Sequence, residues 1–76
     1  MPKTYQQIIN SIISTKTALK ENMGTEILLP QEIQMIEGLG LIPKESIPYF
    51  NRWQMLELLT KFEIGITLEW KFKTAK

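Results

Sequence analysis

The sequence contains no cysteine and no histidine. Without thiols the chain forms no disulfide and no thiolate nucleophile, and without imidazole it lacks the commonest general base and metal ligand near neutral pH. Aspartate is absent as well, so all eight acidic residues are glutamates, and none of the serines has a histidine partner. These absences argue against an enzyme, and we expect no catalytic residue, no metal site and no cofactor.

Strong charge and long apolar runs are missing too. Nine Lys and Arg against eight Glu give a net charge of +1, which attracts neither nucleic acid nor an anionic membrane strongly. No apolar run approaches the roughly 20 residues of a membrane span, and the first residues lack a signal-peptide pattern. With 76 residues, 43% of them hydrophobic, we expect one small globular domain (residues 1–76) in the cytoplasm.

Periodicity predicts two helices in the first half of the chain. Apolar residues recur at intervals of three and four from residue 4 to residue 22, as in an amphipathic helix, and Gly24 stands where a left-handed residue often follows one. Residues 25–29 form a short apolar run before a proline and are predicted to be a short strand. A second helix is expected at 31–37, and the apolar loop 41–43 is expected to lie against the core.

A third helix is predicted from residue 46 to residue 62, with Ser46 as its N-cap. It carries two apolar stripes on different sides of the helical wheel. The first stripe, which we expect in the core, consists of Tyr49, Trp53, Leu56 and Leu59. The second stripe consists of Met55, Leu58 and Phe62. Either this helix is central and both stripes are buried, or the second stripe is left for a partner.

Residues 64–72 alternate apolar and polar side chains, which predicts a strand. A lone strand needs a neighbour, and the candidates are residues 25–29 or the same strand in a second copy of the chain. Its polar face carries Lys71 and Lys73, which either protect an edge or contact a partner. Residues 74–76 are expected to be a frayed tail. The predicted fold is therefore α+β, in the order helix, strand, helix, helix, strand.

The stretches 29–33 and 46–52 resemble a helix-turn-helix, and the element order resembles a small winged-helix domain without its last wing strand. The resemblance covers most of the chain and rests on element order. It implies that the third helix offers Asn51, Arg52 and Gln54 to DNA bases. Against this, residues 31–63 hold three basic residues and five glutamates, a net charge of −2, where phosphates would lie.

Small size, missing catalytic residues, near-neutral charge and surplus apolar helix surface favour a non-enzymatic regulatory protein. It would act by protein–protein contact as an inhibitor, antagonist or adaptor, of the kind that compact phage and mobile-element genomes often encode. Its partner is expected to be another protein, a second copy of the chain, or both. The candidate partner-binding residues are Met55, Leu58, Phe62, Lys71 and Lys73. A DNA-binding regulator is the alternative, and a structural subunit is the third possibility.

Overall fold

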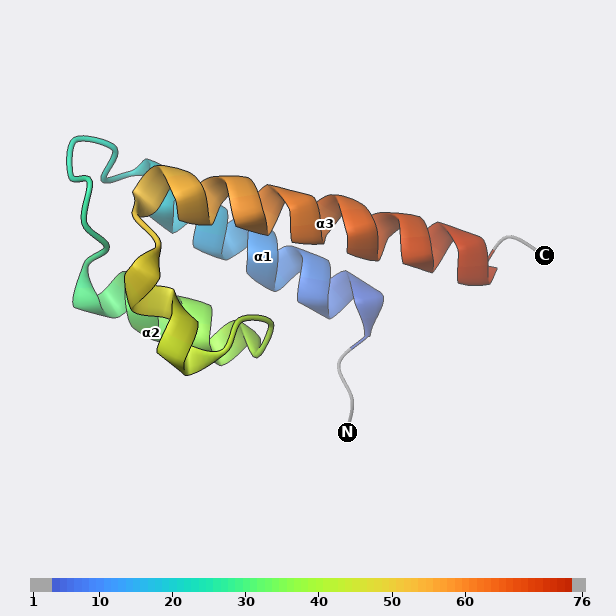
Figure 1. The fold of residues 1–76 in the computed structure, drawn as a ribbon. Helices are drawn as coiled ribbons and strands as arrows, with labels where there is room; N and C mark the ends of the chain where they lie inside the picture. Colours follow the sequence, from blue (N-terminus) through green and yellow to red (C-terminus); the bar gives the residue numbers. More distant parts are fainter. Residues whose placement is uncertain (1–3, 75–76) are drawn as a thin grey trace.

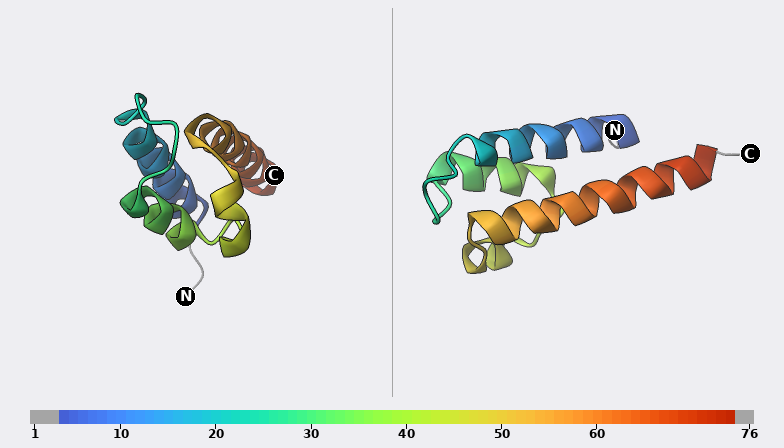
Figure 2. Two further views of the ribbon diagram at one scale, coloured as in Figure 1. Left: turned by 60° about the vertical axis from the view of Figure 1, so that its left-hand side comes forward. Right: turned by 90° about the horizontal axis from the view of Figure 1, so that it is seen from above.

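The computed structural model describes residues 4–74, which form three α-helices and one 3₁₀ helix. The elements are α1 (Tyr5–Lys20), α2 (Pro30–Leu39), the 3₁₀ helix η1 (Lys44–Tyr49) and α3 (Arg52–Thr74). Helices α1 and α3 run antiparallel side by side, α2 packs against α1, and η1 packs against α2 (Figures 1 and 2). The fold is therefore a long helical pair with a short third layer at one end.

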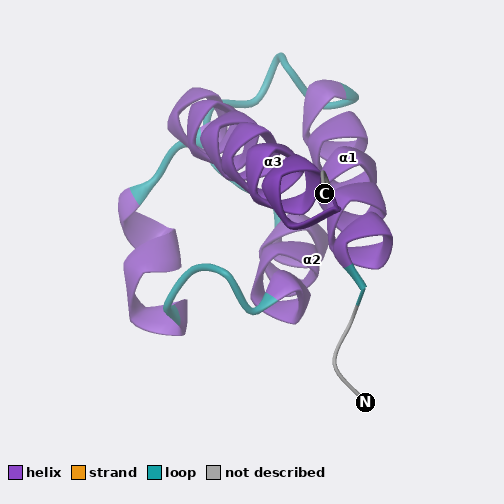
Figure 3. Cartoon of the chain, turned by 90° about the vertical axis from the view of Figure 1, so that its right-hand side faces the viewer, coloured by secondary structure: helices purple, strands orange, loops and turns teal. Residues whose placement is uncertain are grey.

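The predicted α+β fold is wrong, because the part of the chain that the structure describes contains helices and loops but no strand (Figure 3). A winged-helix domain needs its strands, so the truncated winged-helix-like architecture is corrected with it. The expected frayed tail at 74–76 lies largely outside the described residues, and Thr74 closes α3.

Residues 64–72 continue α3 instead of forming a strand. A series of alternating apolar residues also fits a helix, because it splits into two sets whose members are four residues apart. Each set lies on one face of the helix. Phe62, Ile66 and Trp70 are half-buried on one side of α3, while Ile64 and Leu68 are about half exposed on the other. A helix satisfies its own backbone hydrogen bonds, whereas a strand here would have had no neighbour to pair with.

Residues 25–29 form a loop, and one residue of α3 takes the place of the expected neighbouring strand. The carbonyl oxygens of Thr25 and Ile27 accept hydrogen bonds from the Arg52 side chain, at 2.5 and 3.2 Å. The carbonyl oxygen of Glu26 accepts one from the Arg52 backbone N–H, at 2.9 Å. The loop therefore satisfies these polar groups without a sheet.

The three α-helices begin in the same way. In each, the third residue is Gln or Glu, and its side chain accepts a hydrogen bond from the backbone N–H of the residue before the helix. The pairs are Gln7 with Thr4 (2.9 Å), Glu32 with Leu29 (2.7 Å) and Gln54 with Asn51 (3.0 Å). These bonds satisfy backbone donors that a helix start otherwise leaves unpaired.

Two of the expected helix boundaries are corrected. Ser46 is not the N-cap of the third helix, because residues 44–49 form η1, Phe50 is extended, and α3 starts only at Arg52. Gly24 is not left-handed, since the only positive φ among the described residues belongs to Gly40, at 69°, directly after α2. Gly40 therefore provides the left-handed helix end that glycine favours.

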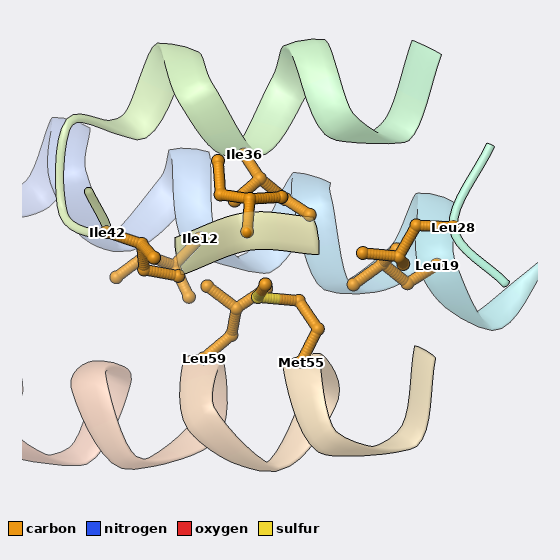
Figure 4. Close-up of a cluster of buried hydrophobic side chains, with 8 residues drawn as sticks. Ile12, Leu19, Leu28, Ile36, Ile42, Met55 and Leu59 are labelled. Carbon is orange, nitrogen blue, oxygen red and sulfur yellow. The ribbon is translucent and has the colours of Figure 1, made fainter. Parts of the chain in front are cut away.

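The hydrophobic core lies where α2 and η1 cover the α1–α3 pair (Figure 4). Its buried members are Ile12, Leu19, Leu28, Ile36, Ile42, Ile47, Met55 and Leu59. Burial of Ile42 confirms that the apolar loop 41–43 is pinned to the core. The expected stripes of the third helix are partly wrong. Leu59 of the first stripe is fully buried and Leu56 is half-buried, as expected for the core, but Trp53 is 56% exposed and Tyr49 is 84% exposed. Met55 of the second stripe is fully buried.

The other end of the pair has only two layers. We call the part formed by residues 5–8 of α1 and 63–73 of α3 the two-helix end, and the part between Ile9 and Phe62 the three-helix end. No residue of the two-helix end is fully buried, and the end of α3 projects past the start of α1 (Figures 1 and 2). Within residues 4–74, no helix combines the length and the hydropathy that a membrane crossing requires.

Candidate interaction surface

The residues expected to read DNA bases are engaged in the fold. Asn51 and Gln54 cap the start of α3 reciprocally: the Gln54 N–H donates to Asn51 Oδ1 at 2.8 Å, and the Asn51 N–H donates to Gln54 Oε1 at 3.0 Å. Arg52 lies between them in sequence, but its side chain is fully buried. Arg52 is therefore withdrawn from the surface, while Asn51 and Gln54 each use their side-chain oxygen to cap α3.

Arg52 forms the centre of a buried polar network. Its Nε and both terminal nitrogens donate to backbone carbonyls, including that of Leu19 at 3.0 Å. The same terminal nitrogens make a two-pronged ion pair with the Glu32 carboxylate, with Nη2 2.8 Å from Oε1 and Nη1 bonded to Oε2. The planar guanidinium suits this arrangement, because its fork matches a carboxylate. One side chain thus ties the end of α1, the loop 25–29 and the start of α2 to α3.

Glu32 is as deeply buried as Arg52, at 1% exposure. Burial alone would raise the pKa of Glu32. The hydrogen bonds from Arg52 and from the Leu29 N–H, with the positive charge of Arg52 and a contact from Asn22, outweigh burial and hold that pKa below its usual value. No buried side-chain nitrogen or oxygen in the described chain lacks a hydrogen-bond partner. The network therefore has a structural role, because each of its buried polar side-chain atoms already has a hydrogen-bond partner within the fold.

The candidate partner-binding residues separate into three groups. Met55 is in the core, so it is not accessible to a partner in this structure. Leu58 and Phe62 are half-buried and pack against the core cluster. Lys71 and Lys73 are exposed on the two-helix end. Lys73 Nζ lies 5.7 Å from the centre of the Tyr5 ring, and Tyr5, followed by Glu69, raises the pKa of Lys73.

An apolar ridge on α3 is more exposed than any of those candidates except the two lysines. It consists of Ile64 (56% exposed), Leu68 (49%) and Phe72 (79%), and we call it the outer ridge. Successive members are four residues apart, so they form one continuous row along the helix surface. No residue described by the structure covers this row, which faces away from α1 and the core.

The sequence contained the signal for the outer ridge, but the signal was ambiguous. Ile64, Leu68 and Phe72 are apolar at four-residue spacing, which a helical wheel places on one face. The intervening Ile66 and Trp70 made the whole segment look alternating, and the strand interpretation put all five on one buried face. Only the assignment of the segment to α3 separates a face toward α1 from a face toward solvent.

A shallow apolar hollow lies between the two helices of the two-helix end. It has a volume of about 600 Å³ and is lined by Thr4, Tyr5, Gln6, Ile8, Glu69 and Trp70. Its lining residues come from the start of α1 and the end of α3. Figure 1 shows that α2 does not extend to this part of the helical pair. Glu69 is the only charged residue in its lining and most of the lining surface is apolar, so the hollow offers mainly apolar contacts.

No metal centre can be built from the described residues, since no three acidic, His or Cys side chains converge there. No family model, curated protein or solved structure matches this chain. The exposed surface of the described chain is therefore the only guide to its function.

Proposed function

We propose that this protein is a non-enzymatic regulatory protein that acts by binding another protein through the outer ridge. The observation that carries the proposal is the row of Ile64, Leu68 and Phe72, three large apolar side chains on one exposed helix face. Single exposed apolar residues are ordinary, but a contiguous row typically marks a contact surface. A partner protein would bind this ridge as amphipathic helices are commonly bound, with the apolar face of α3 in a hydrophobic groove of the partner.

The surroundings of the ridge support protein binding over DNA binding. Lys61 and Lys71 flank it, but Glu57 pairs with Lys61 at 3.6 Å and Glu69 pairs with Lys73 at 3.5 Å, so the α3 surface holds both signs of charge. A duplex needs an uninterrupted positive face for its phosphates. Of the residues that would have read bases, Arg52 is buried in the polar network, and Asn51 and Gln54 use their side-chain oxygens for capping, which lowers the support for the DNA-binding alternative.

The experiment compares the wild-type chain with Leu68→Glu as immobilised baits in extract of the native host. The control is Ile27→Glu, which also places a glutamate at an exposed isoleucine, 77% exposed and outside the ridge. We expect one partner to be retained by the wild type and by Ile27→Glu and lost with Leu68→Glu, while circular dichroism shows all three folded. A partner retained equally by Leu68→Glu would refute binding through the ridge.

A further inference from the structure

Gly65 lies beside the outer ridge in the middle of α3, and nothing within the described chain explains it. A β-carbon built at Gly65 meets no atom within 4 Å, and its φ is not positive. Mid-helix glycine costs up to about 1 kcal/mol relative to alanine. The fold does not require a glycine at this position, and the missing side chain leaves room on the helix surface for a group from outside the chain.

The spacing of the ridge around Gly65 has the form of a knob and a hole. Lys61, Ile64, Gly65 and Leu68 are at positions i, i+3, i+4 and i+7, the four corners of a hole on a helix surface. The absent side chain of Gly65 deepens this hole. Phe72, the most exposed member of the ridge, is one turn beyond it and has the size of a knob.

We infer that the outer ridge pairs with the outer ridge of a second copy of this chain, in an antiparallel arrangement about a two-fold axis at Leu68. In such a pair, a residue that follows Leu68 by four positions lies opposite the residues that precede Leu68 by four and three. Each Phe72 then meets Ile64 and Gly65 of the other copy and enters the hole, and the two-fold axis makes this contact twice. The inference rests on the proposed function in that it uses the same surface.

The charges of the ridge fit this register. Lys71 lies opposite Gly65 of the second copy, and Glu69 lies opposite Thr67, so no two like charges face one another directly. With pairing displaced by a few residues, Phe72 would lie over Lys61 or Leu68 instead of over the glycine. In a pair of two copies, the hole therefore favours this register.

The exposed area predicts a weak dimer. At about 200 Å² for a large side chain, the exposed fractions of the three ridge residues amount to roughly 350 Å² per copy. A stable interface of standard size buries about 800 Å² per partner. We therefore expect half-dissociation in the range of about 10 to 1,000 μM, weak enough for a tighter protein partner to displace the second copy.

Sedimentation equilibrium from about 10 μM to about 2 mM tests the inference. We expect the mass to rise from 8.9 kDa toward twice that value. The decisive variant is Gly65→Leu, which adds apolar area but fills the hole. Its matched control is Gly38→Leu on α2, where a β-carbon also meets nothing within 4 Å. Non-specific apolar attraction predicts tighter association for Gly65→Leu, whereas the hole predicts association at least about tenfold weaker, with the control unchanged.

Thermal unfolding of each variant shows whether the chain is still folded, and Gly65→Ala serves if the leucine variant is not. Alanine should raise the midpoint of unfolding through helix propensity while still weakening the dimer. Association of Gly65→Leu as tight as or tighter than wild type, or a chain that is monomeric at every concentration, overturns the inference. Because the extract experiment uses dilute bait, the proposed function would be judged there independently of this result.

Discussion

The two ends of the α1–α3 pair are stabilised by different means. At the three-helix end, α2 and η1 add a third layer, and every fully buried residue described lies between Ile9 and Leu59. At the two-helix end, two helices meet along a single strip, with half-buried Trp70 and rim contacts such as Lys73 over the Tyr5 ring. Two helices alone can bury only the strip between them. The exposed outer ridge thus lies at the end of the molecule that has no third layer and no fully buried residue among those described.

The largest expected effect is at the three-helix end, from Arg52→Ala. The change leaves the buried Glu32 carboxylate without its counter-charge and removes the side-chain donors to three loop and helix carbonyls. Breaking a buried ion pair in this way costs about 3–5 kcal/mol of unfolding free energy. Urea unfolding followed by circular dichroism measures it, with the exposed Lys44→Ala as control. A loss under about 1 kcal/mol would mean that the network does not hold this end together.

The next effect contrasts two neighbouring residues of α3. Met55→Ala opens a cavity in the core and should cost about 2–5 kcal/mol. Trp53→Ala removes a larger side chain that is more than half exposed, and should cost less than about 1 kcal/mol. This order is the reverse of the one that the expected stripes implied. Equal losses in the same denaturation experiment would show that Trp53 belongs to the core after all.

A smaller effect should follow the titration of Glu32. Its pKa in the folded chain is below the ordinary value of 4.5, so folding favours the ionised form. The stabilisation is therefore complete above about pH 4.5 and is lost as the pH falls through the lower, folded-state pKa. Unfolding free energies of the wild type and Glu32→Gln, measured from pH 7 to pH 3, should differ most at high pH and converge in acid. A difference that stays constant with pH would contradict the ionised pair.

The smallest effect lies at the boundary between the two ends, where Lys16 of α1 and Glu63 of α3 form an ion pair at 3.0 Å. Both side chains are partly accessible, so their coupling should be about 0.2–1 kcal/mol and should fall in high salt. A double-mutant cycle with Lys16→Gln and Glu63→Gln measures it. The fully exposed pair Lys61 and Glu57 is the control and should show weaker coupling. Coupling well above this range would mean that the ion pair anchors the two-helix end.

The two helices of the first half could be predicted well because their signals are local, whereas the strand expected at 25–29 and the left-handed Gly24 were wrong. The helix expected at 4–22 is α1, and the helix expected at 31–37 is α2 with a few residues more. Short-range signals mark the helix ends: Thr4 and Gln7 cap the start of α1, and Gly40 ends α2. Their interactions reach only three or four residues, so no knowledge of the rest of the fold was needed.

Most of the second half could not be predicted because its outcome depends on distant partners, although the start of α3 carried a local signal. Asn51 and Gln54 carry the same capping pattern as Thr4 and Gln7, and this pattern would have placed the start of α3 correctly. The helical state of 64–72 is stabilised by packing on α1, some 60 residues earlier in the sequence. The burial of Arg52 depends on Glu32 and on loop carbonyls that no periodicity identifies. Net charge and spacing count such an arginine as a surface cation, although it is the largest of the fully buried side chains described.

The reach of Arg52 also has a consequence for the order in which the chain can fold during synthesis. Its partners include the carbonyl of Leu19, 33 positions earlier, and Glu32, 20 positions earlier. When α1, the loop and α2 lie outside the ribosome but residue 52 does not, the carboxylate and the carbonyls that the guanidinium will bind can only be hydrated. The polar network of the N-terminal part is therefore completed by a single late residue. A nascent chain stalled with residues 1–51 outside the ribosome should be readily digested by protease, and one carrying a C-terminal extension long enough for α3 to emerge should resist.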